Sequence, residues 1–148
     1  MMIGNPITQL EQLTLNSNAK SFLKETAKWA FFLSIMGFIG IGFLVILAIF
    51  SNIIFSAIPQ AKLVPFDLGF AMTILYLLFA VLYFFPVYYL MQFSTKMKKA
   101  LATKNDETLA ESFKVLKSHY KFIGVFTIIA MSLYIMLIVV SIISGSLL

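Results

Sequence analysis

The sequence has no cysteine, no arginine and a single histidine among its 148 residues. Without cysteine there can be no disulfide, no thiolate metal site and no cysteine-based catalysis. Without arginine a nucleic-acid partner is disfavoured, because arginine supplies the forked contacts to phosphate and guanine. His119 alone cannot give both axial ligands of a b-type haem, and a zinc site would need more ligands. We therefore expect no cofactor and no metal, and we interpret His119 as an interfacial polar residue in preference to a pH sensor.

Charge is also scarce, since 11% of the residues are charged and 61% are hydrophobic. A small water-soluble domain could not bury that much apolar surface. Three stretches, residues 29–55, 68–91 and 122–143, contain no charged residue. Each is long enough to cross a bilayer core of about 30 Å as a helix, the structure that satisfies its own backbone in lipid. The sequence therefore predicts an all-α integral membrane protein with three transmembrane helices.

The lysines are distributed unevenly around these spans. Three precede the first span, seven lie between the second and third, and Lys62 alone lies between the first and second. The positive-inside rule then predicts a cytoplasmic N-terminus and an external C-terminus. We expect contacts with anionic lipid headgroups from the lysines that border the spans. These are Lys28, Lys96, Lys98, Lys99 and Lys121.

We expect one membrane domain over residues 1–148. Its predicted parts are a cytoplasmic segment (1–28), the first span (29–55), an outer loop (56–67), the second span (68–91), a cytoplasmic helical hairpin (92–121), the third span (122–143) and an outer tail (144–148). The hairpin is predicted to turn at Asn105-Asp106, and Thr108 and Glu111 have the spacing of a capping box. Ser17 or Asn18 is the predicted N-cap of the first helix.

Small residues recur on one face of the first span. They are Ala30, Ser34, Gly37 and Ala48, and Gly40 widens the patch. Small residues let helix backbones approach closely in lipid. Two interpretations stay open, packing within the chain and a seam between copies of it.

The second span carries a polar stripe of Thr73, Tyr76 and Tyr83, which predicts either hydrogen bonds between helices or the lining of a pore. Pro86 should kink this span, because it removes one backbone hydrogen bond. The third span has a similar stripe, which includes Thr127 and Tyr134 and which we interpret as a packing face.

No catalytic constellation, phosphate loop or metal-ligand spacing is present in the sequence. The spans also lack the ionisable residues that proton relays and most ion-coupled transporters place there. We expect a non-enzymatic scaffold or accessory subunit of a membrane assembly, and the alternative is a homo-oligomeric pore or channel. The expected partners are membrane lipids together with either a second copy of the chain or another membrane protein.

Three segments, Phe22 to Trp29, Leu82 to Leu90 and Ser112 to Gly124, resemble a family of small bacterial membrane proteins of unknown function. The resemblance runs from about Leu13 to the end of the third span. It implies location in the bacterial inner membrane, and it brings no catalytic residues.

Overall fold

The computed structural model describes residues 15–59 and 63–146. Within these ranges the chain forms three α-helices, α2 (Ser17–Ser56), α3 (Leu68–Thr103) and α4 (Asp106–Ser146). Each helix is long and apolar enough to cross a membrane. The predicted all-α fold with three long apolar helices is therefore confirmed. The predicted segments that fall on residues 1–14, 60–62 and 147–148 lie outside the described residues.

Each helix begins at an Asn or Asp side chain that accepts a hydrogen bond from a backbone amide three residues later. Asn16 Oδ1 accepts from the Ala19 N–H (2.7 Å), Asp67 Oδ1 from Phe70 (3.0 Å) and Asn105 Oδ1 from Thr108 (2.8 Å). Such a bond satisfies one of the free amides of the first turn. The prediction of Ser17 or Asn18 as N-cap is wrong, because Asn16 makes this bond and the helix begins at Ser17.

The turn between α3 and α4 is short. Lys104 adopts the left-handed conformation (φ 52°) and its N–H bonds the carbonyl of Ala100, which closes α3. Asn105 follows as the cap of α4, so the turn lies at Lys104-Asn105, one residue before the predicted position. The predicted capping box of Thr108 and Glu111 is wrong, because Asn105 caps one turn earlier.

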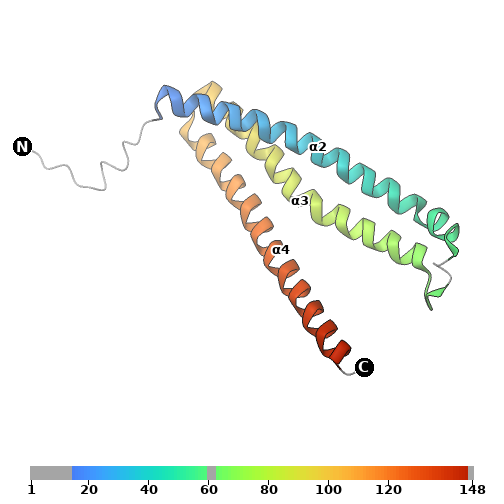
Figure 1. Ribbon diagram of the computed structural model, residues 1–148. Helices are drawn as coiled ribbons and strands as arrows, with labels where there is room; N and C mark the ends of the chain where they lie inside the picture. Colours follow the sequence, from blue (N-terminus) through green and yellow to red (C-terminus); the bar gives the residue numbers. More distant parts are fainter. Residues whose placement is uncertain (1–14, 60–62, 147–148) are drawn as a thin grey trace, which may run out of the picture.

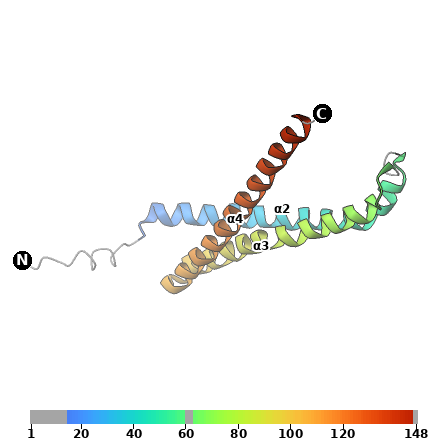
Figure 2. The same cartoon turned by 90° about the horizontal axis from the view of Figure 1, so that it is seen from below.

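All three helices come together near the hairpin, and α4 alone diverges from the other two. In Figure 1, α2 and α3 run side by side, whereas α4 starts beside α3 at the hairpin and then moves away from it. Figure 2, turned by 90°, shows the same divergence of α4 from α3. The molecule therefore has a joined end near the hairpin and an open end towards the C-terminus of α4.

The joined end holds the best-buried apolar side chains. Ala27 and Ala30 from α2 pack with Phe93 and Met97 from α3, and each is at most 5% exposed. Partly buried residues of all three helices surround them: Leu23, Leu90, Leu101, Leu109, Val115 and Leu116. The buried Ser94 hydroxyl donates to the Ala27 carbonyl, which links α3 to α2 at this level.

Candidate functional site

The seam between α2 and α3 is lined by small residues. Ala30, Ser34 and Ala48 of α2 are buried there. A Cβ atom added to Gly37 would lie 2.5 Å from Cγ2 of Val87 on α3, so the backbone of α2 approaches α3 closely at this glycine. Gly40 has no atom within 4 Å of such a Cβ and lies off the seam. Most of the predicted small-residue patch therefore lies at the α2–α3 contact within the chain, and Gly40 alone of its members is exposed outside it.

Hydroxyl groups join α2 and α3 near the loop that connects them. The hydroxyls of Ser51 and Thr73 hydrogen-bond each other, and both lie within 3.2 Å of the carbonyl oxygens of Ala48 and Gly69. Gly69 is buried here, and an added Cβ would lie 2.9 Å from the Cα of Asn52. The close helix approach leaves room for this polar contact in an apolar environment.

The predicted polar stripe of α3 is not one contact surface in this chain. Thr73 is bonded to Ser51 of α2, Tyr76 is partly buried, and Tyr83 is 52% exposed. Pro86 is buried, and α3 continues without interruption through it. The prediction of a kink there stays a prediction.

A hydrogen bond joins α4 to α3 near the boundary of the third predicted span. Nδ1 of His119 lies 2.8 Å from the carbonyl oxygen of Pro86, a bond in which the protonated ring nitrogen donates. His119 therefore has a structural partner on α3, which the sequence alone did not suggest. Its position at the boundary of a span indicates only that the ring donor needs an acceptor nearby, and it does not identify Pro86 as that acceptor.

The membrane half of α4 is the most exposed part of the described chain. Every residue from Thr127 to Gly145 is exposed. Neither Gly124 nor Gly145 has a heavy atom within 4 Å of an added Cβ. The Tyr134 side chain is 66% exposed, and its hydroxyl makes no hydrogen bond with any described residue. The small and polar stripe predicted to be a packing face thus has no protein packed over it in the described chain.

The lysines predicted to contact headgroups lie in different surroundings. Lys96 bonds Glu111 of α4 at 2.6 Å, and the Lys98 ammonium lies 4.2 Å from the centre of the Phe31 ring. Lys28, Lys99 and Lys121 are exposed. The Lys96 hydrogen bond and charge together lower the pKa of the exposed Glu111 carboxyl from its ordinary value.

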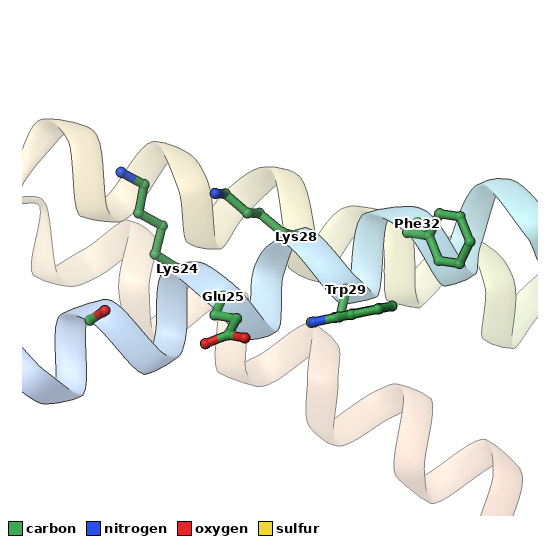
Figure 3. A pocket seen from close by; sticks show the side chains of 6 residues that line it. Lys24, Glu25, Lys28, Trp29 and Phe32 are labelled. Atoms are coloured by element: carbon green, nitrogen blue, oxygen red, sulfur yellow. The ribbon is translucent and has the colours of Figure 1, made fainter.

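A hollow of ≈ 750 Å³ lies along one face of α2. All of its lining residues come from that helix, and they include Lys24, Glu25, Lys28, Trp29 and Phe32. Figure 3 shows Lys24 and Lys28 extending to one side of α2 and Glu25 to the other. A hollow lined by a single helix does not enclose a ligand. Its mixture of cations and aromatic rings is typical of a helix at the membrane interface.

The described residues contain no group of three or more His, Cys, Asp or Glu side chains that could hold a metal ion. The described residues present an apolar helix face, several ammonium groups and a few hydroxyls.

A model of one protein family, described as a family of unknown function (DUF5362), matches residues 68–142. The match covers α3, the hairpin and most of α4, about half of the chain, whereas the resemblance seen in the sequence also took in the first span. Neither a curated protein nor a solved structure matches the chain.

Proposed function

The chain belongs to DUF5362, a family of unknown function, and on this premise we propose that it is a non-enzymatic scaffold or accessory subunit of an assembly in the bacterial inner membrane. The three candidate spans indicate a membrane location. The lysine distribution supports a cytoplasmic N-terminus and hairpin and an external C-terminus.

The observation that carries the proposal is the exposed membrane half of α4. One face of it presents Thr127, Tyr134 and Ser141, which are seven residues, or about two helical turns, apart and therefore lie on the same side of the helix. Side-chain hydroxyls in transmembrane helices usually hydrogen-bond a neighbouring helix, and small residues admit a close neighbour. This face supports docking of a helix from another membrane protein.

The pore alternative has weaker support. Thr73 is already bonded to Ser51 within the chain, and Tyr83 is exposed outside the α2–α3 seam. A pore would require several copies whose tyrosines meet across an axis. One experiment can test both functions if it identifies which protein covers α4 in the membrane.

Cysteine crosslinking tests the proposal cleanly, since the chain has no native cysteine. Single cysteines at Thr127 and Ser141 probe the polar face, and one at Met136 probes the opposite face, two and a half turns from Thr127. We expect the first two, in native membranes, to give one discrete product that contains a second protein, and Met136→Cys to give none.

A product that contains only this chain would replace the accessory role with a homo-oligomer, whose ion flux in liposomes then tests the pore. Equal crosslinking from all three positions, or none from any, would refute docking through this face.

A further inference from the structure

A groove lies between α3 and α4 where the two helices separate. Its main part has a volume of ≈ 450 Å³ and is lined by residues of both helices: Leu82, Tyr89, Ser118, Lys121, Phe122, Val125, Phe126 and Ile129. A second hollow of ≈ 220 Å³ continues it towards the hairpin and shares Tyr89 and Ser118 with it. The two hollows therefore form one elongated groove along α4. In Figures 1 and 2 the ribbons of α3 and α4 move apart from the hairpin onward.

The two ends of this groove differ in chemistry. The hairpin end contains Lys96, Glu111 and Lys114, and Lys121 follows about two helical turns after Lys114. Lys96 is neutralised by Glu111 at 2.6 Å, whereas Lys114 and Lys121 form no ion pair with any described residue. The end that lies within the predicted spans is apolar and is lined by both aliphatic and aromatic side chains. The groove is thus basic at the level of the membrane surface and apolar at the level of the bilayer core.

Polar groups in the middle of the groove add to this pattern. Tyr89 lines both parts, and its hydroxyl makes no hydrogen bond with the described residues. The Ser118 hydroxyl donates to the carbonyl of Lys114, so its oxygen can still accept. A ligand at this level would meet the Tyr89 hydroxyl and the ammonium groups of Lys114 and Lys121, neither of which forms an ion pair with a described residue.

We propose that the groove binds one anionic glycerophospholipid, with its phosphate between Lys114 and Lys121 and an acyl chain along Phe122 and Val125. Basic pockets between transmembrane helices are suited to anionic headgroups. A protein helix fits less well, because the groove wall of α4 is made of large side chains. The small and polar residues that favour helix contact are on the opposite face of α4. The proposal is independent of the partner proposed above.

Native mass spectrometry of the full chain in mild detergent tests this, with added dioleoyl phosphatidylglycerol or dioleoyl phosphatidylcholine as probes. We expect one phosphatidylglycerol molecule to bind, at least about fivefold more tightly than phosphatidylcholine. Lys121→Gln should weaken phosphatidylglycerol about fivefold and leave phosphatidylcholine unchanged. The control is Lys117→Gln, which removes the same charge from the same helix outside the groove.

A second pair of variants tests the apolar end. Val125→Trp should fill the groove and abolish binding of both lipids, whereas Ile128→Trp, at a 67% exposed position outside it, should not. Circular dichroism checks that each variant keeps its helices. Equal binding of the two lipids, equal effects of Lys117→Gln and Lys121→Gln, or unchanged binding in a folded Val125→Trp variant would each overturn the proposal.

Discussion

The α2–α3 pair and the membrane half of α4 contain similar residues and use them differently. In the pair, small residues lie at a close contact, and the hydroxyls of Ser51 and Thr73 bond each other across it. On α4, Tyr134 lies exposed, and the helix diverges from the other two. Small and polar residues on a helix therefore predict a contact face without saying which helix occupies it. For α2 the neighbour is in the chain; for α4 we propose that it is in another protein.

The largest difference in the free energy of unfolding between the two regions is expected when one buried and one exposed methionine are replaced. Met97 is fully buried at the joined end, and Met131 on α4 is 60% exposed. Met97→Ala removes core contacts and leaves a cavity, so we expect a loss of about 2–5 kcal/mol in the free energy of unfolding. Met131→Ala should change it by less than about 0.5 kcal/mol.

Reversible unfolding of the detergent-solubilised chain in mixed micelles measures both methionine variants. A loss at Met131 comparable to that at Met97 would mean that α4 packs on the rest of the chain, contrary to the open arrangement.

Two glycines of α2 sharpen the comparison within one helix. Alanine at Gly37 would place its Cβ 2.5 Å from Cγ2 and 2.9 Å from Cγ1 of Val87. A β-branched side chain has little freedom to move away, so Gly37→Ala should destabilise the α2–α3 pair by about 1–3 kcal/mol. Gly40→Ala meets open space and favours the helix, so it should be neutral or slightly stabilising.

The two variants add the same methyl group to the same helix about one turn apart. The informative result is therefore whether each variant raises or lowers the free energy of unfolding. The unfolding assay used for the methionines applies. Equal effects would show that Gly37 does not set the distance between α2 and α3.

Much of the helical architecture follows from the sequence because lipid leaves few options. A long uncharged run must satisfy its own backbone, so the existence and number of candidate spans are predictable from residues alone. Helix starts are harder, because several cap residues compete within one turn. Asn105, and not Thr108, is the N-cap of α4. Asp106 and Glu107 follow it in the first turn, where negative charges favour a helix N-terminus.

The contacts between helices were much less predictable. The bonds from Ser51 to Thr73, His119 to Pro86 and Lys96 to Glu111 depend on register and rotation, which hydrophobic patterns leave free. The groove beside α4 was missed for the same reason, because it exists only once two helices diverge. Lys96 and Lys121 were predicted from the sequence to contact lipid headgroups, but Lys114 and the apolar side chains that complete the groove were not.

The smallest expected effect concerns the ion pair that ties the hairpin arms together. The hydrogen bond and charge of Lys96 hold the pKa of Glu111 below its ordinary value. A carboxyl whose pKa is lower in the folded state stabilises the fold above its unfolded pKa, and this contribution is lost as the pH falls through the folded value. Because both side chains are exposed, the contribution is small and salt screens it.

Replacing Lys96 should therefore change the titration of the Glu111 carboxyl more clearly than it changes the free energy of unfolding. Lys96→Gln should raise the pKa of Glu111 towards its ordinary value and flatten the loss of stability as the pH falls below that ordinary value. Carboxyl carbon shifts followed by NMR measure this directly, and Lys117→Gln is the control because Lys117 is not among the charges that lower this pKa. An unchanged titration in Lys96→Gln would mean that the arms of the hairpin are not joined by this pair. The attachment of α4 to α3 would then rest on the apolar core and on the bond from His119 to Pro86.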